Sequence, residues 1–452
     1  MSSDLFLTWG AWLILGILGA CWGSVVNWAT YELAYYRRPI SPWSPQRPSP
    51  VSWQDRLPII GWIFLRREGE IWGRYFWIRP LLVETFCAVG LPALYWWEVV
   101  TRGLDFPGEP IDVTTLHVRF GFHVVLFGLM LAGSLIDIDE KTLPDALTVP
   151  GTWLALLIAA GWPWALLPDS PYVPSDLRLQ AIEAGEPWMA KLTEIAVDHP
   201  RFLHVGSPGV WPAYLEGFPR IWPLLAAWGI WWFWCFALMD RRWYSRLGWR
   251  RAWRYFWARF LRSPATWFAV RMGVVGTGGI LVAWMVGGPH WRGLFSALVG
   301  LGAGAGLVWI VRILGWWALQ REAMGFGDVT LMGMLGAAVG WQGSLIIFFL
   351  APIVALVFAV VNLVLRQESL IPYGPFLCVA AAGLILGWQI VWPEARPIFG
   401  LGGLLFLILG GCLLLLPPLL VFVRLCRQLI EGLVLQFTTS GAEQRLGKSE
   451  KA

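Results

Sequence analysis

Two short acidic segments carry the side chains that could do chemistry in this chain. In "LIDIDEKTLPD" (135–145), Asp137 directly follows the apolar run 124–136. In "GFGD" (325–328), Asp328 stands at the start of another apolar run. Two carboxyl groups held close together can hydrolyse a peptide bond, because one activates water while the other, kept protonated by its neighbour, protonates the carbonyl oxygen. Such a pair would titrate as a unit.

Each acid also has a simpler structural interpretation. Asp is a favoured N-cap, so Asp328 and Asp145 each fit the start of a helix. Asp139 and Glu140 follow Asp137 and are expected to lie farther into water. A helix N-terminus at Asp328 would favour its charged form, and the shared proton would then sit more on Asp137. Because sequence spacing does not show whether the two acids meet, the catalytic and the capping interpretations both stay open.

Glycines and a proline border the two acidic segments. Gly325 and Gly327 permit positive φ and the close approach of a second stretch of chain, such as a substrate strand. Pro144 is expected to end the turn after the first acidic segment. Both segments could therefore present a carboxylate to a peptide backbone.

The elements that must position these acids are predicted to be membrane-spanning helices. The 452 residues are 57% hydrophobic and only 14% charged, whereas soluble domains carry about 25% charged residues. No soluble core could bury so much apolar surface, so the composition indicates a polytopic membrane protein. Many of the 34 Trp flank apolar runs, where indole rings favour the membrane interface.

Cysteine and histidine usage argues against several kinds of site. The six cysteines are scattered without CxxC spacing, so neither a zinc knuckle nor a disulfide framework is expected. The five histidines form no HExxH motif. The N-terminus lacks a basic n-region, and we expect it to be a retained first span rather than a cleaved signal peptide.

We predict an all-α integral membrane protein with 10 or 11 transmembrane helices, each needing about 20 apolar residues. The predicted spans lie near residues 5–29, 79–100, 119–136, 146–167, 220–239, 266–287, 295–317, 329–342, 343–363, 375–392 and 398–423. The pair near residue 340 is open, since "VGWQG" fits either a tight turn or a kink.

Loop charge predicts the orientation of these spans. Residues 30–78 and 240–265 hold more arginines than acids and are expected in the cytoplasm. Residues 101–117 and 168–219 carry more acids than bases and are expected outside. An external N-terminus satisfies all four assignments and puts both acidic segments at the cytoplasmic face.

Six regions are predicted along the chain. They are 1–100 (first span, cysteine-free cytoplasmic loop, second span), 101–167 (third and fourth spans with Asp137), 168–219 (polar extracytoplasmic insertion with an amphipathic helix at 176–197), 220–265 (a span and an Arg/Trp-rich cytoplasmic loop), 266–423 (membrane core with the GFGD and IPYGPF motifs) and 424–452 (polar tail). The Arg/Trp-rich segment 241–262 could grip anionic lipid headgroups. Because this segment is juxtamembrane, the lipid bilayer is its predicted partner and no nucleic acid partner is expected.

Three motifs, in this order, resemble those of the bacterial type IV prepilin peptidases, which are membrane aspartic proteases of the GxGD type. They are "LIDIDEKTLPDALTVPG" (135–151), "GFGDVTLMGMLGAAVGWQG" (325–343) and "IPYGPFLCVAA" (371–381), with weaker matches in "GSVVNWATYEL" (23–33) and "DRLPIIGWIFLRREGEIWGRYFWIRPLLVE" (55–84). The resemblance implies that Asp137 and Asp328 are the catalytic pair. It implies supporting roles for the other motif residues, which are Glu84, Asp139, Pro144, Asp145, Gly325, Gly327, Pro372, Gly374 and Pro375.

The same resemblance implies a substrate and a location. The substrate would be a prepilin or pseudopilin, of a type IV pilus or a type II secretion system, with a short basic leader, a Gly before the cut and an apolar helix after it. Cleavage would take place at the cytoplasmic face of the bacterial inner membrane. Proteolysis needs no cofactor in this family, although many members also methylate the new N-terminal amine with S-adenosylmethionine.

The chain departs from the family pattern in three places. Many members carry two zinc-binding CxxC pairs in the first cytoplasmic loop, which has no Cys here, so zinc is not expected. We expect the loop to hold its shape by the packing of Trp43, Trp53, Trp62 and Trp72. The loop is associated with methylation in the family, so methyltransferase activity stays open. Thr330 stands where the family usually has a Lys two residues after the Asp, and the region 168–265 makes this chain longer.

Two other classes of function stay open. A transporter would use buried acids to relay protons or to bind cations, but it predicts mid-span acids and paired repeats, whereas these acids lie at span ends. A non-enzymatic assembly platform of a pilus or type II secretion system, descended from a peptidase, fits the missing cysteines and the insertion. Such a platform has no need of two charged groups at membrane depth. The sequence does not define the oligomeric state.

Overall fold

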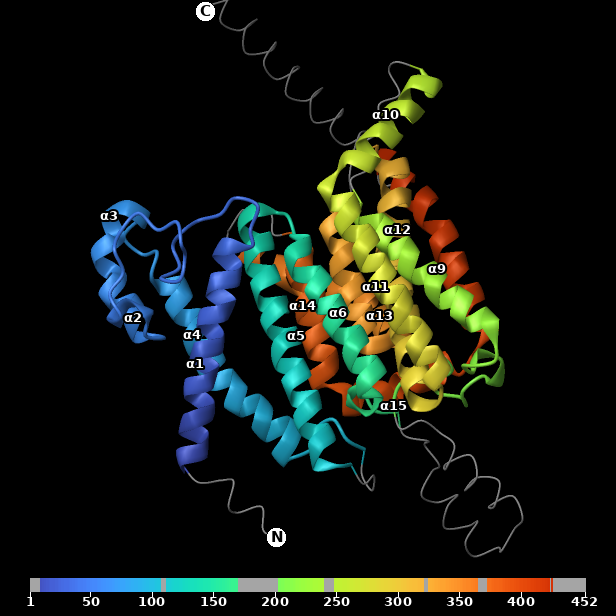
Figure 1. Cartoon of the computed structure of the whole chain (residues 1–452), viewed down its shortest axis with the longest axis horizontal. Coiled ribbons are helices and arrows are strands. Elements are labelled where there is room, and N and C mark those ends of the chain that lie inside the picture. Colours follow the sequence, from blue (N-terminus) through green and yellow to red (C-terminus); the bar gives the residue numbers. More distant parts are fainter. Residues whose placement is uncertain are drawn as a thin grey trace, which may run out of the picture. The chain divides into compact units, whose positions relative to one another are not determined.

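The computed structural model consists of helices, turns and loops throughout the part of the chain that it describes (Figure 1). The described residues are 9–106, 111–169, 202–239, 248–320, 324–364, 372–422 and 424–425. Within them, an isolated antiparallel bridge joins Pro168 to Phe202. The amphipathic helix expected at 176–197 and the tail after residue 425 lie outside the described residues. The predicted all-α class is confirmed for the described part.

Eight of the described helices are long and apolar enough to cross a membrane. They are α1 (Trp9–Glu32), α4 (Ile78–Tyr95, continued by η4, Trp96–Val100), α5 (Val113–Glu140), α9 (Ile221–Leu238), α11 (Pro264–Val286), α12 (Gly288–Leu319), α13 (Phe326–Val364) and a last helix over Gly403–Phe422. Shorter helices are α6 (Asp145–Gly161), α10 (Trp249–Arg262), α14 (Gly374–Leu386) and α15 (Trp388–Phe399). One- and two-turn elements are η2 (Gln54–Arg56), α2 (Ile60–Phe64), η3 (Leu65–Glu68), α3 (Gly69–Trp72), η5 (Pro163–Ala165) and η6 (Ala213–Leu215).

This count corrects the prediction of 10 or 11 spans, and three places account for the difference. Helix α6 has only 17 residues, fewer than an ideal span needs. Helices α14 and α15 are bent by 96° at a short break, so the pair counts as one further span at most. The spans predicted at 329–342 and 343–363 are counted once, as α13, although this stretch is divided at Gly340.

A sharp turn at Gly340 divides α13 into two segments. Gly340 has φ 75° and ψ 175°, a conformation that suits glycine because it has no Cβ. A Cβ placed on Gly336 would lie 2.8 Å from Oγ of Ser344, whereas eight residues of straight helix rise about 12 Å. The chain therefore bends back at Gly340, and "VGWQG" forms a tight turn.

Two compact units make up the chain. The larger comprises Met1–Gly306 and Gly327–Gly400, and the smaller comprises Leu307–Phe326 and Leu401–Ala452. Both Asp137 and Asp328 belong to the larger unit. Within the smaller unit, the Arg312 guanidinium donates to the Met324 carbonyl (3.1 Å) and so ties the end of α12 to the segment before α13.

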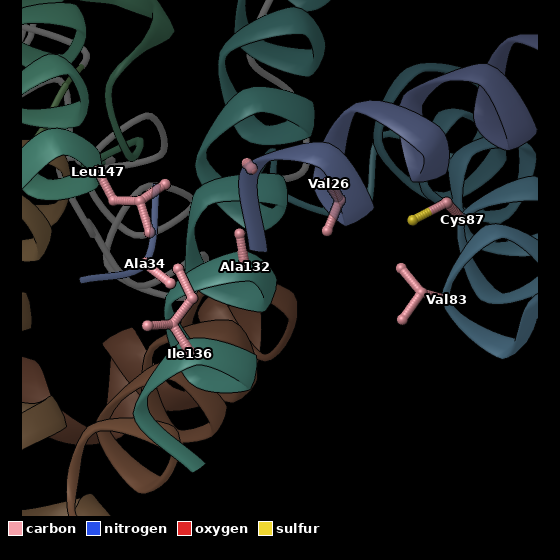
Figure 2. Close-up of a cluster of buried hydrophobic side chains, with 8 residues drawn as sticks. Val26, Ala34, Val83, Cys87, Ala132, Ile136 and Leu147 are labelled. Carbon is pink, nitrogen blue, oxygen red and sulfur yellow. The ribbon is translucent and has the colours of Figure 1, made fainter. Parts of the chain in front are cut away.

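A buried apolar cluster joins α1, α4, α5 and α6 beside the first acidic segment (Figure 2). Its members are Val26, Ala29, Ala34, Val83, Cys87, Ala132, Ile136 and Leu147. Helices α1 and α4 approach closely, because a Cβ on Gly23 would lie only 2.6 Å from Cα of Glu84. Since Ile136 directly precedes Asp137, this core fixes the end of α5 that carries the aspartate.

Buried ion pairs fix the opposite end of α5. Arg119, which is fully buried, contacts Glu98 of η4 at 3.1 Å and Asp105 of the following loop at 2.7 Å. Nδ1 of His123 lies 3.0 Å from the same Glu98 carboxylate. Because an unpaired buried charge is costly, these contacts favour one rotation and one depth of α5.

The tryptophans of the first loop do not all pack as expected. Trp62 is 2% exposed, and the half-buried Trp72 packs against the same small core. Trp43 and Trp53 are 51% and 71% exposed. The packing prediction is therefore wrong for Trp43 and Trp53.

Buried carboxylates hold this loop in addition to the tryptophan core. Glu68 accepts hydrogen bonds from the Arg47 guanidinium and from the Ser49 hydroxyl. Asp55, which is 1% exposed, accepts a hydrogen bond of 2.6 Å from Arg67. Sequence reasoning missed both ion pairs because their partners lie 21 and 12 residues apart in an irregular loop.

The described ends of the predicted insertion 168–219 are hydrogen-bonded to α13 and α15. The Trp388 indole donates to the Pro168 carbonyl (2.8 Å). The Gln342 amide, just after the turn at Gly340, donates to the His204 carbonyl (2.7 Å). These hydrogen bonds hold Pro168 and His204, in the two described ends of the predicted insertion, against α15 and α13.

Candidate active site

Asp137 lies in the last turn of α5 and is 4% exposed. The helix ends just after it, because Lys141 adopts a left-handed conformation (φ 55°) and its N–H bonds back to the Asp137 carbonyl (2.8 Å). The Asp137 side chain accepts a hydrogen bond from the Gly374 N–H through Oδ2 (3.2 Å). A residue 237 positions away thus orients this carboxylate.

Gly374 is the first residue of α14 and must be a glycine for this contact. A Cβ at position 374 would lie 2.4 Å from Oδ2 of Asp137 and 3.1 Å from Cδ1 of Leu143. Pro375 follows in the first turn, where a missing N–H costs nothing. The "PYGP" motif therefore aims a helix N-terminus at Asp137, the arrangement that suits an anion. Pro372 lies just outside this helix.

Asp328 is the third residue of α13 and is 7% exposed. It lies in the first turn of the helix, two residues inside its start, so the interpretation of Asp328 as an N-cap is wrong. Gly325 precedes the helix and is exposed. Neither Gly325 nor Gly327 has positive φ, so that part of the expectation is also wrong. Both aspartates have a helix N-terminus nearby, and the argument that placed the proton on Asp137 no longer separates them.

The Leu143 side chain lies between the segments of the three motifs, which are 135–151, 325–343 and 371–381. It is 5% exposed and belongs to the turn between α5 and α6. A Cβ on Gly327 would lie 2.6 Å from Cβ of Leu143, and a Cβ on Gly374 would meet the other end of the same side chain. The close approach expected at Gly327 is therefore confirmed. Sequence reasoning did not single out Leu143, whose only signal is an apolar residue inside a polar turn.

Cys378 lies near both aspartates. It is one turn into α14, is 4% exposed and lies beside Ser134 of α5. Both Asp137 and Asp328 are close enough to act on this one thiol. Burial, and then the charge of Asp328, raises the pKa of the neighbouring Tyr373 to about 12. Both carboxylates thus lie around the first turn of α14.

The remaining acids of the first segment anchor the chain. Asp139 receives two hydrogen bonds from the Arg79 guanidinium, of 2.7 and 2.8 Å. The Glu140 carboxylate accepts hydrogen bonds from the backbone N–H groups of Tyr35 and Tyr36, which follow α1. Asp145 is the first residue of α6, and Pro144 occupies the N-cap position, so the prediction of Asp145 as the N-cap is wrong by one residue.

Glu84 of α4 is buried between α1 and the first loop. It is 1% exposed, so a surface position is excluded. Its carboxylate accepts hydrogen bonds from Ser24 (2.7 Å) and Asn27 (3.2 Å) of α1, from the Trp62 indole (2.8 Å) and from the Ile59 N–H. These contacts join α1, α4 and the loop. They do not bring Glu84 to the aspartates.

Thr330 replaces the lysine expected from the family pattern. Its hydroxyl donates to the Gly327 carbonyl (3.0 Å), and the residue is 2% exposed. It therefore supports the first turn of α13, which carries Asp328. Among the described residues, no group of three or more His, Cys, Asp or Glu side chains is arranged to hold a metal ion.

Part of the chain matches a known protein family. Residues 266–360, which include Asp328, match the Type IV leader peptidase family. Asp137 lies outside the matched residues. No solved structure matches the chain.

Curated relatives match over part of their length. Leader peptidase HopD of Escherichia coli is 40% identical over 100 residues, covering 21% of this chain and 61% of the relative. The Prepilin leader peptidase/N-methyltransferase of Klebsiella pneumoniae is 30% identical over 158 residues, covering 33% and 61%. That of Aeromonas salmonicida is 33% identical over 110 residues, covering 23% and 34%. The matches thus cover less than two thirds of each of these relatives. In these matches, and in the three motifs that meet at Leu143, the chain is similar to the type IV leader peptidase family.

Proposed function

We propose that this chain is a membrane aspartic endopeptidase that removes the basic leader of a prepilin or pseudopilin. The observation that carries the proposal is the convergence of Gly327 and Gly374 on Leu143, which brings the segments of Asp137 and Asp328 together. Both acids are buried and both act on the Cys378 thiol. The names of the relatives, which include leader peptidase and prepilin leader peptidase, support the same activity.

The chemistry follows from two nearby carboxyl groups. One ionised group removes a proton from the attacking water, and the other, protonated, gives its proton to the carbonyl oxygen of the scissile bond. The tetrahedral intermediate then collapses, and the leaving amine receives the proton that the first carboxyl group took from water. We assign these roles to the pair as a unit, because two strongly interacting groups share their titration. The Gly374 N–H holds one oxygen of Asp137 in place during this cycle.

The cytoplasmic side follows from loop charge. The loops before α4 and α11 are rich in arginine, which favours the cytoplasm. On that orientation the last turn of α5 and the first turn of α13 lie at the cytoplasmic membrane face. A prepilin whose apolar helix lies beside the spans would present its leader junction at this depth.

Two of these relatives are named as N-methyltransferases. In the first loop of this chain, the buried acids Asp55 and Glu68 are already paired with Arg67 and Arg47. We therefore derive no methyl-transfer step through S-adenosylmethionine.

A cleavage assay tests the proposal directly. The full chain in detergent is given a synthetic prepilin with a basic leader, and the products are read by mass spectrometry with S-adenosylmethionine present. Asp137→Asn and Asp328→Asn should each lower cleavage by at least about a hundredfold, since general acid–base catalysis contributes about that much or more. Asp112→Asn is the matched control, because Asp112 caps the other end of α5 and Asn caps equally well.

The outcomes separate enzyme from platform. Loss of cleavage in both dyad variants, with normal thermal unfolding and an active control, supports the peptidase. An added methyl mass on the product would reveal a second activity. If wild type and variants leave several prepilins and pseudopilins uncut, the aspartates are structural, and the assembly platform becomes the better description.

A further inference from the structure

Helix α10 is a short basic helix with an aromatic face. Its 14 residues, "WRRAWRYFWARFLR", contain five arginines and no acid. The aromatic residues Trp249, Trp253, Phe256 and Phe260 recur at spacings of four, three and four, which puts them on one side of a helix. The arginines all lie off this stripe. They are Arg250, Arg251, Arg254, Arg259 and Arg262.

The aromatic face is partly exposed. Trp249 is 73% exposed and Trp253 is 49% exposed, whereas Phe256 and Phe260 are half-buried. The ring of Phe256 stacks on that of Phe260 at 5.7 Å, so the stripe is continuous. Apolar surface costs about 25 cal/mol for each Å² left in water. An apolar environment over this face would therefore stabilise the protein.

The position of α10 at the edge of a span indicates what that environment is. The helix ends at Arg262, and α11, a candidate span, begins at Pro264. The Trp267 indole of α11 donates to the Leu261 carbonyl of α10 (2.9 Å). The end of α10 is thus fastened to the first turn of a span, where the bilayer changes from hydrocarbon to headgroups.

We propose that α10 lies in the membrane interface and binds anionic phospholipid headgroups of that leaflet. Indole rings favour the interface, and an amphipathic helix with Arg on one face and Trp and Phe on the other lies in its plane. Guanidinium groups pair with phosphate oxygens in a bidentate way. The positive charges of this helix, which contains no acid of its own, select a negatively charged lipid over a zwitterionic one. An acidic protein or a nucleic acid could satisfy the arginines but would leave the aromatic face in water.

Hydrogen exchange of the full chain in lipid nanodiscs tests this proposal. Exchange of the backbone amides of 249–262 is compared between pure phosphatidylcholine and phosphatidylcholine with about one third phosphatidylglycerol. The test variant carries Arg→Gln at 250, 251, 254 and 262. The matched control carries Arg→Gln at 37, 56, 66 and 74, four exposed arginines of the other cytoplasmic loop. The readout does not depend on proteolysis, so it is separate from the proposed peptidase activity.

Each arginine near an anionic surface strengthens binding about fivefold, so the phosphatidylglycerol discs should slow exchange of α10 by at least tenfold in wild type and control. Salt should weaken this protection, and the test variant should lose it while exchange in α5 and α13 stays unchanged. Equal protection in both lipids, with no effect of the four substitutions, would overturn the proposal. Protection that appears in neutral discs and grows with protein concentration would overturn it too, since a second copy of the chain would then cover α10.

Discussion

Replacing Gly374 by alanine should remove most of the proposed peptidase activity without unfolding the protein. The added Cβ would lie 2.4 Å from Oδ2 of Asp137, whereas ordinary contacts begin at 3.4 Å, so the carboxylate or the helix start must move by about 1 Å (3.4 − 2.4). A misplacement of 1 Å at a reacting group can cost about a hundredfold in rate. The hydrogen bond of 3.2 Å between the Gly374 N–H and Asp137 would stretch or break at the same time. We therefore expect kcat for prepilin cleavage to fall about a hundredfold, with KM much less affected, because the change acts on the catalytic geometry.

Gly383→Ala is the matched control for this substitution. Gly383 lies in the same helix, and a Cβ there would have no neighbour within 4 Å. It should keep wild-type kcat and gain up to about 1 kcal/mol of stability from helix propensity. Thermal unfolding of both variants in detergent separates loss of catalysis from loss of fold. A Gly374→Ala protein that folds and cleaves within twofold of wild type would refute the reasoning, because Asp137 could then not be held by this contact in the catalytic arrangement.

Three further predictions follow from other contacts. Gly327→Ala puts a Cβ 2.6 Å from Cβ of Leu143, so cleavage should fall at least about tenfold, as measured in the same assay. Glu84→Gln leaves a single acceptor oxygen facing four donors, and should lower the free energy of unfolding by about 2–4 kcal/mol, as measured by thermal unfolding. Burial opposes ionisation of Asp55, but hydrogen bonds from the Ser52 backbone and from Arg67 outweigh it and hold the pKa of Asp55 below its usual value. Its folded pKa is thus lower than its unfolded pKa, so its contribution to stability is present above about pH 4 and is lost as the pH falls. Limited proteolysis of the first loop should therefore accelerate on acidification in wild type and depend less on pH in Asp55→Asn.

Hydropathy and charge determined the elements of this fold. The spans predicted at 79–100, 220–239 and 266–287 agree with α4 plus η4, α9 and α11 to within two residues at each end, because the length of an apolar run alone decides whether it can cross a bilayer. The same reasoning left "VGWQG" open between a tight turn and a kink, and it failed at the break between α14 and α15. Both are bends inside apolar sequence, where one glycine conformation or a few residues redirect the chain and hydropathy does not change.

The residues of the site could be identified from the sequence, but the contacts between them could not. Asp137, Asp328 and the "PYGP" motif could each be picked out as local patterns of acid, glycine and proline. Three contacts depend on how the helices pack in space. Gly374 binds Asp137 across 237 residues, Leu143 lies between Gly327 and Gly374, and Glu84 accepts hydrogen bonds from four donors. Local sequence encodes helix formation and burial, because those depend on neighbours along the chain. Side-chain contacts between distant segments depend on the packing of the whole bundle, and the tertiary structure alone decides them.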